Sequence, residues 1–148
     1  MVGLIDKSEI LTKCYEGNWP SFHDAEVLDV HLWRGWLKPG AGWDSRNVFP
    51  RVTLKIRILE ATQSGATGHG HDILATFRFH DVDTITIEHF DHINIIDEFH
   101  VESQERGTYR DGTPLPPYLT VRIGGSLEVA FRCFRIEVVE AVAYQHDT

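Results

Sequence analysis

Cysteine is scarce in this chain. Only Cys14 and Cys133 occur among its 148 residues, and they lie far apart in the sequence. Two distant cysteines cannot build the disulfide framework of a small secreted protein, and they lack the close spacing of a zinc knuckle or a redox motif. We therefore expect two reduced, buried thiols.

The sequence also lacks long apolar runs and has few positively charged residues. No stretch approaches the roughly 20 apolar residues that cross a bilayer, and the first residues lack the charged and apolar regions of a secretory signal. The 14 Lys and Arg residues are outnumbered by 22 Asp and Glu residues, which gives a net charge of -8. This charge disfavours contact with nucleic acid or anionic lipid and favours a basic partner. We expect a cytoplasmic protein.

The familiar catalytic motifs are missing as well. The sequence has no Gly-rich phosphate loop, no nucleophile elbow and no Cys-His arrangement. Histidine, in contrast, is abundant, with nine residues that often stand beside carboxylates. His69 and His71 have the spacing of a metal-binding pair on a strand. No carboxylate follows Asp72 in the next four positions, and glycines surround the pair. We therefore predict no metal and no cofactor.

A second histidine lies at the most informative stretch, which runs from Trp19 to Leu28. Pro20 fixes φ and starts a turn, and the chain then becomes a strand. His23 is followed by Asp24 and Glu26, so these three residues stand where a helix meets the first strand. One interpretation is acid–base catalysis by His23 with a carboxylate. The other is that His23 or Asp24 satisfies backbone groups at this junction.

The remaining pattern is that of one domain built mainly from strands. Ile5 to about residue 16 has the spacing of a short amphipathic helix, and the chain from about 25 to 140 alternates like strands joined by turns. In the first strand, Leu28, Val30 and Leu32 should share one face. We predict an α+β fold over residues 1–148: a strongly curved, half-barrel-like antiparallel sheet of about six or seven strands, with the N-terminal helix packed on it. Two long polar loops interrupt it, at 35–49 and 104–117.

Three stretches together resemble the immunity protein 50 family of bacterial polymorphic toxin systems. They are Trp19 to Leu28 with its Phe-His-Asp-Ala-Glu element, Phe77 to Asp97, and Ser126 to Cys133. The resemblance implies a small intracellular protein that binds and neutralises a cognate toxin, and it carries over no catalytic residue. The matched positions, which can serve the fold or the partner, are Trp19, Phe22, His23, Asp24, Glu26 and Asn94.

We therefore predict a non-enzymatic binding protein. Its affinity would come from aromatic side chains in the long loops, with acidic residues steering a basic toxin. The loop aromatics are Trp36, Trp43 and Tyr109, although the tryptophans can also fold back onto the core. The alternative is a small hydrolase or isomerase, with or without a metal, in which His23, Asp24 and Glu26 converge with another histidine in a concave pocket. A homodimer joined through an open sheet edge is a further possibility.

Overall fold

A computed structural model describes residues 1–35, 50–59 and 72–145. Every strand in these ranges belongs to one antiparallel sheet of eight strands, in the order β4-β7-β6-β5-β1-β2-β3-β8. The strands are β1 (Ala25–Trp33), β2 (Arg51–Ile58), β3 (Ile73–His80), β4 (Asp83–Glu88), β5 (Ile95–Gln104), β6 (Tyr118–Gly125), β7 (Glu128–Cys133) and β8 (Arg135–Ala143).

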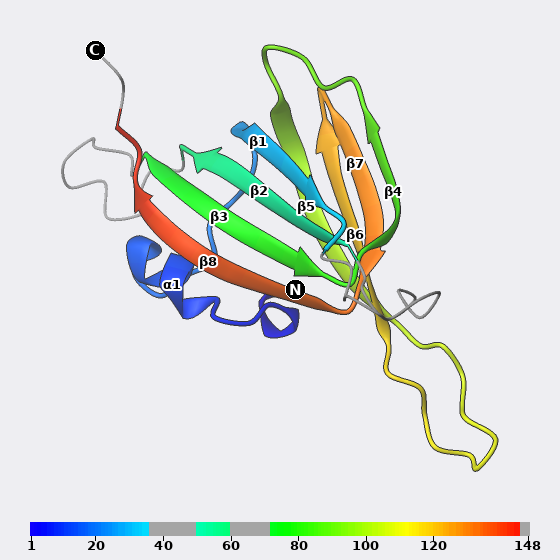
Figure 1. Ribbon diagram of the computed structural model, residues 1–148. Helices are drawn as coiled ribbons and strands as arrows, with labels where there is room; N and C mark the ends of the chain where they lie inside the picture. Colours follow the sequence, from blue (N-terminus) through cyan, green and yellow to red (C-terminus); the bar gives the residue numbers. More distant parts are fainter. Residues whose placement is uncertain (36–49, 60–71, 146–148) are drawn as a thin grey trace.

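The sheet folds over on itself, as Figure 1 shows. β1 pairs with β5 only at Ala25 and Glu26, so the sheet bends sharply there and divides into a β1-β2-β3-β8 half and a β5-β6-β7-β4 half. The sheet does not close, since β4 and β8 remain its two ends. The predicted curvature and antiparallel pairing are thus present. The predicted six or seven strands are too few, and the fold is mainly β.

The core lies between the two halves. Along β2, every second residue from Val52 to Ile58 is at most 1% exposed, as the period of a half-buried strand requires. Aromatic rings from the two halves pack together in the core. The ring centroids of Phe79 on β3 and Phe131 on β7 are 4.9 Å apart, and those of Phe77 on β3 and Phe99 on β5 are 5.4 Å apart. Because both halves turn their apolar faces to this core, their outer faces point in opposite directions.

The N-terminal segment covers the β8 edge. The Asp6 amide donates to the carbonyl of Ile136 at 2.8 Å, and the Val138 amide donates to the carbonyl of Asp6 at 3.0 Å. This pairing blunts an edge that would otherwise be open to another strand. Leu11 follows on the helix and is fully buried. The N-terminal helix therefore packs where it was predicted.

The helix is shorter than the predicted span of 5–16. Only α1 (Glu9–Thr12) is α-helical, and 3₁₀ turns flank it at Val2–Leu4 and Lys13–Tyr15. Lys7 and Glu16 both have left-handed backbone angles, with φ of 57°, and these bound the helical stretch. Within the described ranges, no helix is long and apolar enough to span a bilayer.

Candidate interaction surface

The aromatic residues of the Trp19 to Leu28 stretch belong to the core. Phe22 is 6% exposed, and its ring lies 4.9 Å from Phe99 and 6.0 Å from Phe77. Trp19 packs beside it, with 5.7 Å between the ring centroids. These contacts hold the segment that links α1 to β1 against the aromatic centre. Trp19 and Phe22 are therefore positioned as fold determinants.

His23 and Asp24 lie instead on the open surface. Their side chains are 66% and 72% exposed, and His23 Nε2 is 3.7 Å from an Asp24 oxygen. His23 Nδ1 is 3.8 Å from Asp97 of β5, a neighbour that the sequence did not indicate. These distances are too long for hydrogen bonds. The Asp24 backbone amide donates to the carbonyl of Ile96 at 2.9 Å, and the His23 amide donates to the Ser21 hydroxyl at 3.2 Å. Backbone groups of this junction are thus satisfied by Ile96 and Ser21.

Glu26 belongs to a different charge group. It pairs across the strands with Arg57 of β2, whose guanidinium makes two hydrogen bonds to Asp72, of 2.9 and 2.8 Å. These hydrogen bonds, opposed by desolvation, raise the pKa of Arg57. Glu26 thus lies beside Arg57, away from His23 and Asp24. In the described geometry, no second histidine joins His23 and Asp24 in a concave pocket.

Asn94 has a structural environment. It is 4% exposed, and its Nδ2 donates to the carbonyls of Asp91 at 2.8 Å and Val27 at 3.4 Å. Its Oδ1 accepts the Asp91 amide at 2.7 Å. The side chain thereby closes the turn before β5 and ties it to β1.

Several predicted residues fall outside the described ranges: Trp36, Trp43, His69 and His71. Across the parts of the chain that the structure does describe, no three His, Cys, Asp or Glu side chains are grouped so that they could hold a metal ion.

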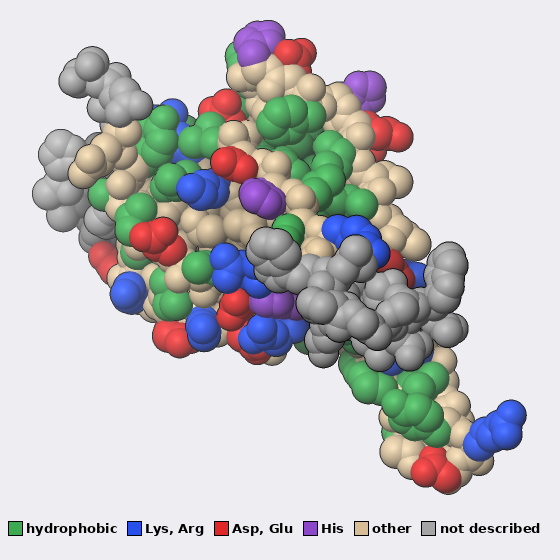
Figure 2. All heavy atoms as spheres, in the orientation of Figure 1, with side chains coloured by type: hydrophobic (Ala, Val, Ile, Leu, Met, Phe, Trp, Pro, Cys, Tyr) green, Lys and Arg blue, Asp and Glu red, His purple; other side chains and the backbone are tan. Residues whose placement is uncertain are grey.

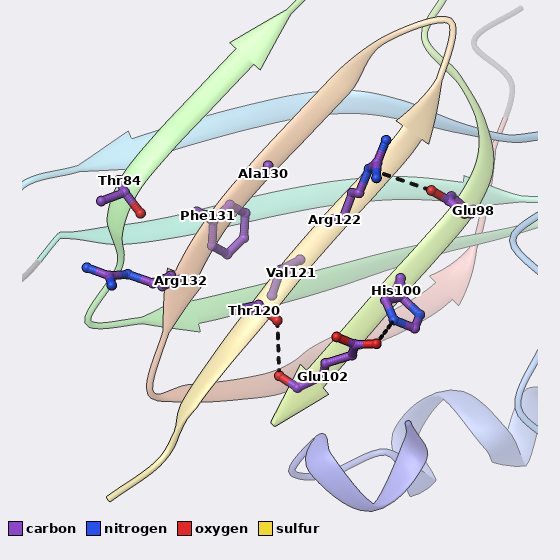
Figure 3. Close-up of a pocket in the computed structure, with 10 residues that line it drawn as sticks. All are labelled: Thr84, Glu98, His100, Glu102, Thr120, Val121, Arg122, Ala130, Phe131 and Arg132. Carbon is purple, nitrogen blue, oxygen red and sulfur yellow. Dashed lines mark hydrogen bonds and ion pairs between the residues drawn. The ribbon is translucent and has the colours of Figure 1, made fainter. Parts of the chain in front are cut away.

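The outer face of the β5-β6-β7-β4 half is hollowed and polar, with a volume of about 630 Å³ (Figure 3). Residues directly opposite on paired strands share a face, so the registers define which side chains lie here. The outer face of this half carries five carboxylates and two guanidiniums, which belong to Asp83, Glu88, Glu98, Glu102, Glu128, Arg122 and Arg132. We call this surface the acidic face.

Both arginines of the acidic face have a carboxylate partner on it. Arg132 makes two hydrogen bonds of 2.8 Å to Asp83, and Arg122 lies 3.7 Å from Glu98. The bonds from Arg132, opposed by desolvation, lower the pKa of the Asp83 carboxyl. Glu88 and Glu128, by contrast, stand opposite each other on β4 and β7 without an ion pair to any described residue. The face therefore presents uncompensated negative charge.

A hairpin extension, residues 105–117, projects beyond the acidic face (Figure 1). We call it the arm. The Tyr109 amide donates to Thr113 at 2.7 Å, and the Leu115 amide donates to Gly107 at 3.0 Å, so its backbone is ordered by its own bonds. At its base, the Arg106 guanidinium lies 4.6 Å from the centroid of the Tyr118 ring. Tyr109 near the tip is 52% exposed. The structure thus presents one predicted contact residue on an ordered support.

The acidic face and the arm are continuous, because β5 and β6 form part of the face and the arm connects them. Sequence reasoning identified Tyr109 but did not place the acidic residues on one face. The sequence did contain a sign of this face. Glu98 and Glu102 are an even number of residues apart on one strand, as are Glu128 and Arg132 on another, so each pair lies on one side of its strand. The pairing of these strands was the missing information.

Comparison with known proteins gives one match. A family model described as immunity protein 50 matches residues 7–144. No curated protein and no solved structure matches the chain significantly. The family match spans every strand and the helix α1. The chain therefore belongs to the immunity protein 50 family.

Proposed function

We propose that this protein is a non-enzymatic immunity protein that binds a cognate bacterial toxin and neutralises it in the cytoplasm of the producing cell. The observation that carries the proposal is the family match over residues 7–144. The family is described as one of immunity proteins. Protection by direct binding requires a surface to which the toxin can bind.

The acidic face and the arm together supply such a surface. Exposed tyrosines at interfaces contribute large contact areas at low entropic cost, and Tyr109 sits on an ordered arm. Unpaired carboxylates such as Glu88 and Glu128 attract a basic partner and speed its encounter. The net charge of -8 adds to the same field. We infer that the toxin is basic and that a single domain, residues 1–148, presents this surface.

The enzymatic alternative has no support in the described geometry. It required His23, Asp24 and Glu26 to converge with another histidine in a pocket. His23 and Asp24 lie on an open surface, and Glu26 lies beside Arg57.

The test begins with the neighbouring genes, and a toxin-like domain encoded there is the partner to purify. The purified toxin domain should form a stoichiometric complex with the protein in calorimetry, and co-expression should rescue the growth of cells that produce the toxin. If neither complex nor rescue is seen with a folded, active toxin, the proposal is wrong. A monomer in light scattering before addition of toxin would also remove the homodimer possibility.

A further inference from the structure

The opposite side of the molecule carries a second hollow with the reverse charge. It lies on the outer face of β1, β2 and β3 and has a volume of about 510 Å³. Arg51, Lys55 and Arg78 line it, with Asp29 as the one carboxylate among its lining residues. In a chain of net charge -8 this is an exceptional local excess of cations. Figure 2 looks onto this side, where Lys, Arg and His side chains lie between acidic ones above β2, β3 and β8.

Arg78 has an unused donor here. Its Nε is shielded from solvent and has no hydrogen-bond partner within the described part of the chain. The residue opposite it on β8 is Glu137, the natural candidate for a partner. Yet the Glu137 carboxylate already has three other partners: Lys7 at 3.4 Å, the His80 imidazole at 3.1 Å and Arg135 at 3.5 Å. A buried donor on a charged group lowers the stability of the fold when it has no acceptor. The unsatisfied Nε of Arg78 is therefore consistent with a site that a ligand completes.

The other two cations of the hollow also have no ion pair with a carboxylate in the described ranges of the chain. The Arg51 guanidinium stacks on the ring of Trp33, 4.1 Å from its centroid, which fixes its position and leaves it charged. Lys55 stands opposite Asp29 on β1 and forms no ion pair with it in the described structure. Three cations from two adjacent strands thus border one hollow. Among the residues that the structure describes, none forms an ion pair with any of these three cations.

We propose that this hollow binds a phosphate-type oxyanion carried by a small molecule. Guanidinium groups match the geometry of phosphate oxygens and form strong charge-assisted hydrogen bonds with them. The volume suits a ligand of small-molecule size. The site lies on the far side of the core from the acidic face and goes beyond the proposed neutralisation of a toxin.

Titration with inorganic phosphate at constant ionic strength, followed by the backbone amide resonances, tests the site. Saturable shifts are expected at the amides of His31, Thr53 and Arg78, whereas chloride alone should leave them unchanged. Arg78→Gln and, separately, Lys55→Gln should each weaken phosphate binding about tenfold or more. Lys55 is exposed, so its variant keeps the test valid if Arg78→Gln lowers stability.

The matched control is Arg122→Gln, which removes one guanidinium from the acidic face and should leave phosphate affinity unchanged. The proposal is overturned if phosphate produces no saturable shift at these amides. It is equally overturned if folded Lys55→Gln and Arg78→Gln bind phosphate as tightly as the parent protein. Toxin binding does not enter this experiment, so its outcome is independent of the proposed function.

Discussion

Glu88 on β4 and Glu128 on β7 stand directly opposite each other, at the end of the acidic face. Like charges in this position destabilise a sheet. Neither carboxylate has a compensating cation among the residues that the structure describes. A pair of this kind lowers the stability of the fold, and residues that lower stability are common in binding sites.

Glu128→Gln should therefore make the protein more stable and a poorer binder. We expect the free energy of unfolding to rise by about 0.2–1 kcal/mol. We expect association with the toxin to slow several-fold at low ionic strength, with the difference shrinking as salt is added. Urea unfolding and stopped-flow association measure the two effects. Glu140→Gln, an exposed change on β8, is the control and should leave the association rate unchanged.

Tyr109→Ala tests the arm. The ring is 52% exposed, so its removal should leave the unfolding temperature nearly unchanged. If Tyr109 is an anchor of the complex, the loss should be about 2 kcal/mol of binding free energy, or about thirtyfold in Kd. Calorimetry with the toxin measures it, and Arg110→Ala beside it is the control for a general disturbance of the arm. Unchanged affinity in Tyr109→Ala would move the interface away from the arm.

Phe22 and His23 are neighbours in sequence with opposite expected roles. Phe22→Ala should lower the free energy of unfolding by about 3–5 kcal/mol, because it opens a cavity among the rings of Phe77 and Phe99. His23→Ala should change it by no more than about 0.5 kcal/mol, since the side chain is 66% exposed. Denaturant unfolding of both variants gives the comparison. A large loss in His23→Ala would show that its distant carboxylates matter more than their geometry implies.

Glu137 should make stability depend on pH in the acid range. Its side chain is 9% exposed, and although desolvation opposes the change, the hydrogen bond with His80 and the charges of Arg135 and Lys7 lower the pKa of its carboxyl below the usual 4.5. The unfolded chain therefore binds a proton at higher pH than the folded one. This contribution is complete above the unfolded pKa and is lost as pH falls through the folded value.

Glu137→Gln should remove that contribution. We expect a loss of about 1–3 kcal/mol at neutral pH, because Lys7 and Arg135 lose their shared carboxylate and His80 loses its hydrogen-bond partner. We also expect a shallower fall of stability below pH 4.5 than in the parent protein. Thermal unfolding across pH measures both, and an unchanged acid slope would contradict the assignment.

The two cysteines should differ in reactivity. Burial raises the pKa of the Cys133 thiol to about 12, so almost none is thiolate at neutral pH. Cys14 is partly exposed. A disulfide reagent should modify Cys14 in the native protein and reach Cys133 only after unfolding. Native Cys14→Ser should then be nearly inert, and rapid modification of that variant would contradict the burial of Cys133.

The strands were predictable wherever alternation continued without interruption, as in β2. The prediction failed where the backbone breaks that period. Leu127 to Val139 looks like one strand, yet the chain bends at Phe134, whose amide donates to the carbonyl of His80. β7 and β8 result, which accounts for the extra strand. The buried positions change phase there, from Phe131 and Cys133 to Ile136 and Val138, and this shift was readable in advance.

Other local features had no readable signal. A bulge between Val27 and Asp29 makes Leu28 an extra, exposed residue, while Val30 and Leu32 pair with Leu54 and Val52. Val30 packs against the core, whereas Leu32 near the end of the strand is 53% exposed. Composition cannot show such a bulge, because it depends on the partner strand. Asp24 has a left-handed backbone, with φ of 65°, which breaks strand alternation at this point, and its carboxylate lies 3.7 Å from the His23 ring.

The pairing of Asp6 with β8 joins an early segment of the chain to the last strand. During translation β8 leaves the ribosome after the other strands that the structure describes, so the edge of β3 stays uncovered until then, and Asp6 has no strand to pair with before β8 arrives. The sheet is therefore completed only once β8 has been synthesised, when Asp6 can pair with it.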